Sequence, residues 1–496
     1  MAFLRTHRPM VRTSGVALLV AGSLIAAACG GDDGGSEGDG ASGSAACPVD
    51  ALKSAKGTVN VDVWYAFQGL PAQAIQNLAD KYNASQSKVK VTVANQGSYD
   101  EQLSKYKTGL GKPSTLPEVV TAEDTNTRFL IDSKSVVSAA DCVKADPDAA
   151  TMYDDLVPAV KAAYSLDGKL VPAGFAVSTP MLYFNKRHFA AAGLDIAKPP
   201  TTLEELRAAA EKIKAANIPG VAKPLVLKMD AWYIEHWLTG EAKPVVDQEN
   251  GHAAPATKTL IGDASGAELF QWIRKMVDDG LLNAVASSDD ISPYLAVATE
   301  SGSMLIETSA AITTIDAAIS GTLNADILPQ AADMDLSTFK FDTLDVGVAP
   351  TPGVKKAGVG QIGGNAWYIV KKTPEEIAAA WDFMKFVNQV DTQVEWTMLG
   401  GYLPSHEAVA EDPRLTTDWD SSRKGGWLKQ AYASVLTLDP KFTGPWIGAY
   451  AGFRAEVRAA LDKIGQQNGD PATVVPEAVT RIEKAFETYN KNPGQG

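Results

Sequence analysis

The alternation of short apolar strands with amphipathic helices is the feature that most constrains how this chain folds. Residues 59–63 (VNVDV) alternate valine with polar residues, which predicts a half-buried strand. Residues 71–83 carry apolar side chains at the spacing of an amphipathic helix, and residues 89–93 and 118–121 predict two further strands. A strand–helix–strand rhythm of this kind favours an α/β fold with a parallel sheet.

The same rhythm returns in the second half of the chain. About 450 residues follow position 46, enough for two or three domain-sized cores. We therefore expect two α/β lobes rather than one continuous sheet. Strands are predicted at residues 182–185, 302–308 and 366–370, and helices at residues 203–216, 374–388, 448–464 and 475–490.

The first 28 residues have the composition of a secretion signal. A stretch with three arginines and no acid precedes an apolar run at residues 16–28, which is too short for a membrane span of roughly 20 apolar residues. The AAAC sequence ending at Cys29 resembles a bacterial lipobox, and the Gly- and Ser-rich residues after it are typical of a flexible tether. We expect a signal peptide at 1–28, a lipid on Cys29 and a tether over 29–46. An ordinary signal peptide with an incidental cysteine is the alternative.

Two cysteines remain after the tether begins, Cys47 and Cys142. An exported chain meets an oxidising compartment, so we expect a disulfide between them, with two separate thiols as the alternative. The five histidines never fall at metal-ligand spacing, and neither HExxH nor CxxC occurs, so we expect no metal and no cofactor.

The net charge argues against nucleic acid as a partner. It is -14 for the whole chain, and it becomes -17 when the signal is removed because that segment holds three arginines and no acid. Phosphate backbones are bound by clustered Lys and Arg, which an acidic chain of this kind does not favour.

The residues that directly follow the predicted strands are candidate ligand contacts. Ligands of open α/β sheets bind beyond the carboxyl ends of the strands. Aromatic rings beside carboxylates suit a polyhydroxylated ligand, because the C–H face of a sugar stacks on a ring while acids accept its hydroxyl protons. Each ring is alternatively a core residue. The candidates from this rule are Tyr65, Phe67, Tyr99, Glu123 and Asp124.

Several ordered blocks of the sequence carry a family resemblance. The segments VDVWYAFQG, NQGSYDEQL, VVTAEDTNT, STPMLYFNK, GSMLIETSAAI, QIGGNAWYIV and GGYLPSHEAV occur in the order seen in family 1 extracellular solute-binding proteins, the receptors of carbohydrate ABC importers. The chain is most similar to the glycerol-3-phosphate-binding branch and more distantly to maltose-binding proteins. The resemblance spans nearly all residues from about Thr58 onward.

The resemblance implies an α/β, two-lobed fold of the type II periplasmic-binding-protein kind, with hinge strands and a ligand cleft between the lobes. Lobe 1 is expected at 47–174 plus 363–400, and lobe 2 at 175–362 plus 401–496. The crossings then fall near residues 174–177, Gly363 and Gly401. Closure on the ligand is expected to be a hinge motion.

The contacts of the glycerol-3-phosphate branch carry over residue by residue. Several of these residues also have a structural alternative: a loop position for Tyr99, a helix cap for Glu123, lobe packing for Trp232, and local backbone bonding for Ser178 and Ser309. The positions that the resemblance marks as ligand-binding are Tyr99, Glu123, Ser178, Trp232, Ser309, Gly364 and Tyr402.

One departure from the branch bears on the ligand. Trp446, in GPWIGAYAGFR, stands where the phosphate-binding relatives have an arginine. An indole cannot make the bidentate, charge-assisted hydrogen bonds by which arginine binds phosphate. Its ring face suits a sugar or a quaternary ammonium group, so we expect Trp446 to bind the ligand. A glycerophosphodiester or glycerol-3-phosphate is the closest rival to a sugar, because Arg454 lies nearby in the sequence.

An enzyme and a purely structural or adhesive lipoprotein are the other classes considered. A glycosidase needs two carboxyl groups about 5 to 9 Å apart, and adjacent Glu123 and Asp124 are expected to point to opposite faces of extended backbone. No hydrolase or phosphate-loop motif occurs, so we expect no catalysis. We expect a monomeric, lipid-anchored receptor on the outer face of the bacterial cell membrane. It would capture a sugar or oligosaccharide and deliver it to ABC importer permease subunits.

Overall fold

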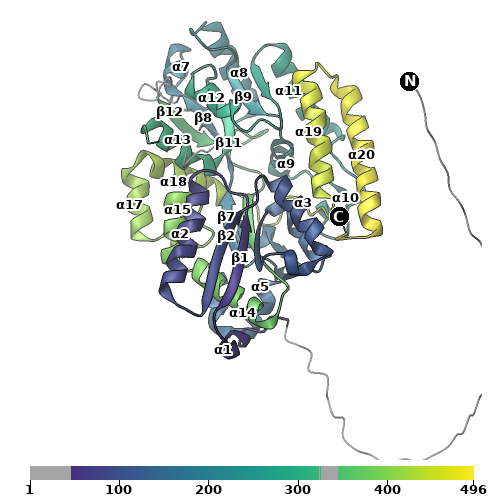
Figure 1. Cartoon of the computed structure of the whole chain (residues 1–496). Helices are drawn as coiled ribbons and strands as arrows, with labels where there is room; N and C mark the ends of the chain where they lie inside the picture. The colour runs from purple at the N-terminus through teal and green to yellow at the C-terminus, as the bar shows by residue number, and fades with distance from the viewer. Residues whose placement is uncertain (1–45, 323, 325–343, 496) are drawn as a thin grey trace, which may run out of the picture. The chain divides into compact units, whose positions relative to one another are not determined.

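The computed structural model describes residues 46–322, 324 and 344–495, which belong to one compact unit. The expected signal peptide, lipidation site Cys29 and tether therefore lie outside the described residues, apart from position 46. In the described part of the chain, no helix is long and apolar enough to cross a membrane. Two sheets organise the unit, and Figure 1 shows them one above the other, each with its own helices.

The first sheet, in the order β2-β1-β3-β13-β4 with β7 also paired to β13, forms the first lobe. Its first three strands run parallel, and β13 runs antiparallel to β3, β4 and β7. The strands are β1 (Val59–Tyr65), β2 (Val89–Asn95), β3 (Val119–Glu123), β4 (Val136–Val137), β7 (Gly174–Ser178) and β13 (Gly363–Val370).

The second sheet, in the order β10-β9-β11-β8-β12, forms the second lobe. The neighbours β10, β9 and β11 run parallel, whereas β8 is antiparallel to both β11 and β12. The strands are β8 (Pro180–Asn185), β9 (Leu225–Lys228), β10 (Leu282–Val285), β11 (Met304–Thr308) and β12 (Val346–Pro350), and β5 (Ser165–Leu166) and β6 (Lys169–Leu170) form a separate hairpin.

Helices cover both sheets, and several begin with a side-chain cap that the sequence encodes. Ser98 and Thr373 each form a capping box with the glutamate three residues later, at the start of α3 and of α14. The helices that belong with the first sheet are α1 (Ala51–Ser54), α2 (Leu70–Ser85), α3 (Tyr99–Leu110), α4 (Thr127–Asp132), α5 (Ala139–Ala145), α6 (Pro158–Ala163), α14 (Pro374–Val387) and α15 (Val390–Gly400).

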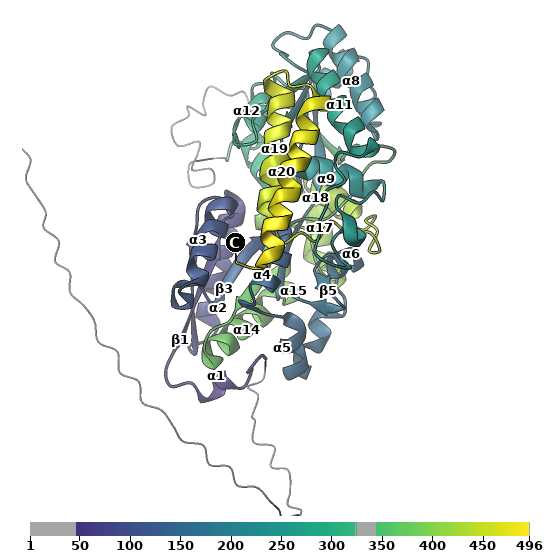
Figure 2. The ribbon, with the colours of Figure 1, turned by 90° about the vertical axis from the view of Figure 1, so that its right-hand side faces the viewer.

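The second lobe carries the longer C-terminal helices. Figure 2 shows α19 and α20 side by side along it, and the end of α20 reaches α4, where the Tyr489 hydroxyl donates to Asp132 over 2.9 Å. The remaining helices are α7 (Lys186–Ala191), α8 (Leu203–Ala215), α9 (Ala231–Gly240), α10 (Asp247–Asn250), α11 (Ala264–Asp278), α12 (Ser292–Ala298), α13 (Ile312–Ile319), α16 (Glu407–Ala410), α17 (Pro413–Ser421), α18 (Arg423–Val435), α19 (Tyr450–Gln466) and α20 (Pro471–Lys491), with 3₁₀ turns at Pro113–Thr115, Asp124–Asn126, Pro147–Tyr153 and Ser309–Ala311.

The predicted strands and helices are confirmed, whereas the expectation of a parallel sheet holds only in part. Each sheet keeps three parallel strands and adds antiparallel ones. The strand β13 is antiparallel because it enters the first sheet on its return from the second, where β12 ends. The lobes are joined at Thr179 between β7 and β8, at residues 351–362, and after Gly401, where the Leu403 N–H donates to the Val177 carbonyl over 2.8 Å. The residue boundaries expected for the two lobes stay a prediction.

The Cys47–Cys142 disulfide is confirmed. Both cysteines are almost fully buried, and the bond joins the first described residues to α5 across 95 positions of sequence. It closes a covalent loop that contains the three parallel strands of the first lobe.

Candidate functional site

A cavity of about 670 Å³ lies between the two lobes, at the carboxyl ends of their parallel strands. Its size falls inside the range of roughly 300–1,000 Å³ that is usual for small-molecule sites. The first lobe contributes residues at the ends of β1, β2 and β3, and the second lobe contributes residues at the end of β9 and along β11. Next to the connections, Ser178 ends β7, Gly363 and Gly364 begin β13, and Tyr402 follows Gly401. This arrangement is the one expected of a ligand held at the strand ends of open α/β sheets.

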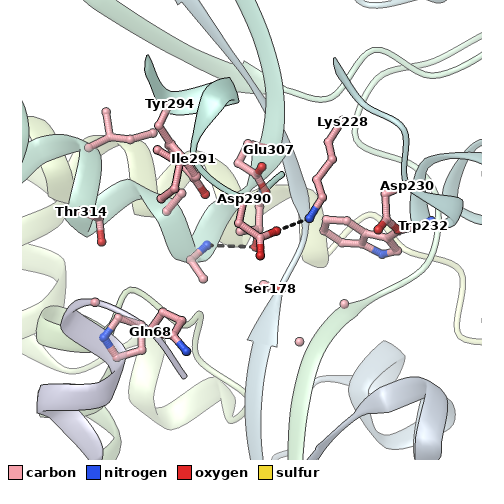
Figure 3. A pocket seen from close by; sticks show the side chains of 18 of the residues that line it. Gln68, Ser178, Lys228, Asp230, Trp232, Asp290, Ile291, Tyr294, Glu307 and Thr314 are labelled. Carbon is pink, nitrogen blue, oxygen red and sulfur yellow. Dashed lines mark hydrogen bonds and ion pairs between the residues drawn. The ribbon is translucent and has the colours of Figure 1, made fainter. Parts of the chain in front are cut away.

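Charged side chains of both signs line one end of this cavity. The carboxylates are Glu123, Asp124, Asp230, Asp290 and Glu307. Three cations accompany them, and each is paired: Lys228 with Asp290, Arg458 with Asp230 over 2.9 Å, and Arg454 with Glu235. Figure 3 shows the Lys228–Asp290 pair in the middle of the cavity, with Glu307 beside it. The polar end is therefore rich in acceptors and its positive charge is already compensated.

Arg454 is the most constrained of these cations. Its Nε and Nη2 atoms donate to the two carboxylate oxygens of Glu235 over 3.0 and 2.7 Å, and the Tyr450 hydroxyl donates to the same carboxylate over 3.0 Å. The remaining Nη1 atom lies 3.5 Å from Glu123 Oε1. A buried, bidentate pair of this kind fixes the guanidinium, leaving one edge toward the cavity.

Burial changes the acidity of the cavity carboxyl groups. It raises the pKa of Asp124 to about 7 and the pKa of Glu307 to about 6. Burial also raises the pKa of Glu123, against the opposing effect of Arg454. For Asp230 burial acts in the same direction, but Arg458 and Arg454 lower its pKa below the ordinary value. Near neutral pH Asp124 is therefore only partly ionised, and the site offers hydrogen-bond acceptors together with a carboxyl group able to donate, a set that matches ligand hydroxyls.

A hydrogen-bonded cluster joins β13 to the two tyrosines of the cavity. The Asn365 amide donates to the Tyr99 hydroxyl over 3.1 Å and lies 3.5 Å from the Tyr402 hydroxyl. Tyr402 stacks on Trp396 at 5.4 Å with an interplanar angle of 4°, and Phe67 packs against the same tyrosine at 5.4 Å. Packing from behind thus holds the phenol in place.

Trp232 supplies the large aromatic face at the polar end. It lies at the start of α9, where its backbone N–H donates to the side chain of the capping residue Asp230 over 2.9 Å. The strand β13 passes directly under the indole, because a Cβ at Gly363 would lie 2.4 Å from Trp232 Cζ2. A glycine is therefore required for this approach of backbone and ring. Figure 3 shows Trp232 next to Asp230, on the far side of Lys228 from Tyr294.

The structure brings seven of the eleven residues expected from the sequence into the cavity: Tyr99, Glu123, Asp124, Ser178, Trp232, Gly364 and Tyr402. Glu123 and Asp124 both line it, so the expectation that they face opposite sides is wrong. The chain leaves the extended conformation at Asp124, which begins a 3₁₀ turn.

The other four expected residues lie elsewhere. Tyr65 and Phe67 are buried in the core of the first lobe, and Ser309 is fully buried, with its hydroxyl accepting from the Thr179 N–H over 3.2 Å. Trp446 lines a second, much smaller cavity of about 20 Å³ that it shares with Asp124, and its ring packs near His252. Its part in ligand binding stays a prediction.

Several cavity residues were not anticipated from the sequence. Lys228 is the last residue of β9, Asp230 lies two residues beyond it, and Glu307 lies near the end of β11. The strand-end rule applied to the second sheet would therefore have found them. Asn365 lies within β13 opposite Glu123, and only the pairing of β13 with β3 reveals this neighbour.

Comparison with known proteins agrees with this architecture. The family model described as "Bacterial extracellular solute-binding protein" matches residues 77–422, more than half of the chain. The chain belongs to this family. Its relatives in sequence include periplasmic binding proteins.

This solute-binding protein is 27% identical over 459 residues to the sn-glycerol-3-phosphate-binding periplasmic protein UgpB of Yersinia pestis bv. Antiqua (strain Antiqua), covering 88% of this chain and 95% of the relative. It is 25% identical over 454 residues to UgpB of Escherichia coli (strain K12), covering 89% and 95%.

Solved structures support the two-lobed fold. UgpB from Mycobacterium tuberculosis in complex with glycerophosphocholine has a TM-score of 0.68 at 19% identity, covering 88% of this solute-binding protein and 100% of that chain. The cyclic alpha-maltosyl-1,6-maltose binding protein from Arthrobacter globiformis has a TM-score of 0.65 at 20% identity, covering 87% and 100%. Similarity at this level shows the fold, which confirms the α/β periplasmic-binding-protein architecture expected from the sequence.

Proposed function

We propose that this solute-binding protein captures a sugar or short oligosaccharide between its lobes and delivers it to the permease of an ABC importer. The observation that carries the proposal is the polar end of the cavity. There Trp232 offers a ring face beside carboxylates, and Lys228, Arg454 and Arg458 are already neutralised by ion pairs. A neutral ligand with many hydroxyls gains stacking and hydrogen bonds there and requires no free cation.

A glycerophosphodiester is the second candidate. Arg454 favours it, because one edge of the guanidinium faces the cavity, and the relatives include proteins named for glycerol-3-phosphate and one solved with glycerophosphocholine. A dianionic phosphate monoester suits the site less well, since five carboxylates line the described cavity against three cations.

A thermal-shift panel of mono- and oligosaccharides, glycerophosphodiesters and glycerol-3-phosphate tests the proposal. A ligand at about 100 times its Kd stabilises the folded state by about 2.7 kcal/mol. We expect sugars to raise the Tm most. Small-angle scattering with the strongest ligand should show a smaller radius of gyration as the lobes close. An unchanged Tm and radius with every compound would refute the receptor function, and product formation from a bound sugar would point to an enzyme instead.

The anchoring of the receptor is a further part of the proposal. The composition of the N-terminal segment supports the proposal that the signal is cleaved before Cys29 and that a lipid is attached to this cysteine. Residues 30–46 would then be the tether to the outer face of the membrane. The full-length protein should fractionate with membranes, and Cys29→Ser should be released into the soluble fraction. Recovery of both proteins in the same fraction would contradict the anchor. Size-exclusion chromatography of the released variant should give a monomer.

A further inference from the structure

The cavity has a second end whose chemistry differs from the first. At this end α12 contributes Leu295 and Ala298, and α13 contributes Ile315, Ala318 and Ile319. Figure 3 places Tyr294, Ile291 and Thr314 on this side, with the Lys228–Asp290 pair between them and Trp232. The two ends are parts of one cavity, and the ion pair marks the boundary between them.

The apolar lining follows from the helical spacing of α13. Thr314, Ile315, Ala318 and Ile319 lie at positions i, i+1, i+4 and i+5, which places them on one face of the helix. The opposite positions, Thr313 and Ala317, are buried, whereas Ala318 and Ile319 are half-exposed. The face turned to the cavity is therefore mainly aliphatic, with the Thr314 hydroxyl at its edge.

The apolar end exceeds what a sugar head group requires. Hydroxyl groups find acceptors and donors at the polar end, but α12 and α13 offer them mainly aliphatic carbon. A hydroxyl placed against aliphatic carbon loses its hydrogen bonds to water without replacement. Leaving an apolar wall wet is also unfavourable, and grooves of this kind mark binding surfaces.

We propose that the natural ligand carries an aliphatic chain, which occupies the compartment between α12, α13 and the segment from residue 66 to the start of α2, while the polar head lies beside Trp232. The ligand class is an alkyl or acyl derivative of a sugar, or of the glycerol head of the second candidate. This inference rests on the proposed receptor function and deepens it. The continuity of the cavity from Trp232 to Ile319 supports a single ligand bridging both ends.

The affinity should rise with the length of the chain. Burying one methylene group in an apolar site tightens binding about fourfold, equivalent to about 0.8 kcal/mol. Titration calorimetry with methyl, butyl and hexyl glucosides and maltosides measures this increment directly. Glycerophosphocholine compared with its monohexanoyl ester makes the same comparison on the other head group. We expect each hexyl or hexanoyl compound to bind at least 30-fold more tightly than its short partner.

Variants locate the effect within the molecule. Ala298→Phe fills the compartment and Leu295→Ser makes its wall polar, and both should reduce the ratio of hexyl to methyl affinity at least tenfold. Leu436→Ser changes a side chain that is 53% exposed and lies outside the cavity, so it should leave the ratio unchanged. Circular dichroism and the Tm of each variant verify that it is folded.

The outcomes separate this inference from the function beneath it. Equal affinity for the methyl and hexyl members of a series that binds would overturn the chain compartment and leave the receptor function in place. Binding of no head group, with or without a chain, would overturn both. A length dependence that persists unchanged in Ala298→Phe and Leu295→Ser would overturn the location assigned to the chain.

Discussion

Among single residues, Trp232 and Trp446 make contrasting contributions to the site. Trp232 lines the main cavity, and Trp446 lies 5% exposed at a separate small one. From the sequence alone, Trp446 is an expected ligand contact, and Trp446→Ala would then weaken binding tenfold or more. With both positions known, we expect Trp232→Ala to weaken binding of the best ligand at least tenfold, since stacking area is lost, and Trp446→Ala to weaken it less. Calorimetry on both variants decides between them. A larger loss for Trp446→Ala would contradict this order.

The Asp124 carboxyl group gives the folded state a characteristic pH dependence. Its pKa is about 7 when folded, against about 3.9 when unfolded, so between these values the folded chain binds more protons and the free energy of unfolding falls as pH rises. Asp124→Asn should therefore raise the free energy of unfolding by about 1–2 kcal/mol at pH 8 and by little at pH 4. Urea unfolding at both values measures this.

Asp412 provides a control of opposite sign. Its hydrogen bond with Arg414 lowers the pKa of Asp412 to about 2, so its contribution to stability is present above the unfolded value and lost only in strong acid. Asp412→Asn should destabilise at pH 8, while still capping α17. If Asp124→Asn and Asp412→Asn changed the free energy of unfolding in the same direction at pH 8, the burial of Asp124 would not be the cause of the pH dependence.

The site could be predicted from sequence where a residue lies at or just beyond the carboxyl end of a parallel strand. Glu123 ends β3, Asp124 follows it, and Tyr99 begins the helix after β2. The rule is wrong for Tyr65 because side chains alternate along a strand. Val61, Val63 and Tyr65 share one face of β1, and that face is in the core. Asn365 was missed because its nearness to Glu123 arises from a strand pairing across more than two hundred positions.

At the level of elements, the pairing of β13 with β7 depends on a glycine. Gly364 has a φ of 114°, and a Cβ there would lie 2.0 Å from the Ala176 carbonyl oxygen. Gly364→Ala should therefore reduce the free energy of unfolding by about 2 kcal/mol or more, as measured by urea denaturation.

Gly426, inside α18, is the matched control for that substitution. The nearest atom to an added Cβ is 3.8 Å away, so Gly426→Ala should stabilise the protein by about 0.5–1 kcal/mol through the helix preference of alanine. Destabilisation by both changes to a similar degree would contradict the role given to Gly364.

Element types were predictable because period-2 and period-3.6 patterns are local properties of the sequence. The helix at residues 203–216 and the strand at 89–93 correspond to α8 and β2. Strand direction is not local, since it depends on where the chain has been between two strands. The antiparallel pairing of β8, β12 and β13 therefore could not be predicted from the local hydrophobic pattern, which reflects only residues close in sequence.

For the whole molecule, the Cys47–Cys142 disulfide should be a major source of stability. It closes a loop across 95 positions, and removing such a bond costs about 2–5 kcal/mol. The double variant Cys47→Ala, Cys142→Ala should lose this amount in urea unfolding, and reductant should lower the stability of the parent but not of the variant. Ligand affinity should change little, because neither cysteine lines the cavity. A loss below about 1 kcal/mol would contradict the prediction.

The same bond also sets the path of mechanical force. Tension applied to the chain ahead of Cys47 passes through the disulfide directly to α5, because the covalent bond is a shorter and stiffer route than the backbone between the two cysteines. The bypassed segment contains β1, β2 and β3 together with Tyr99, Glu123 and Asp124. When the chain is pulled by its N-terminal end, the backbone that carries these cavity residues therefore bears little of the tension.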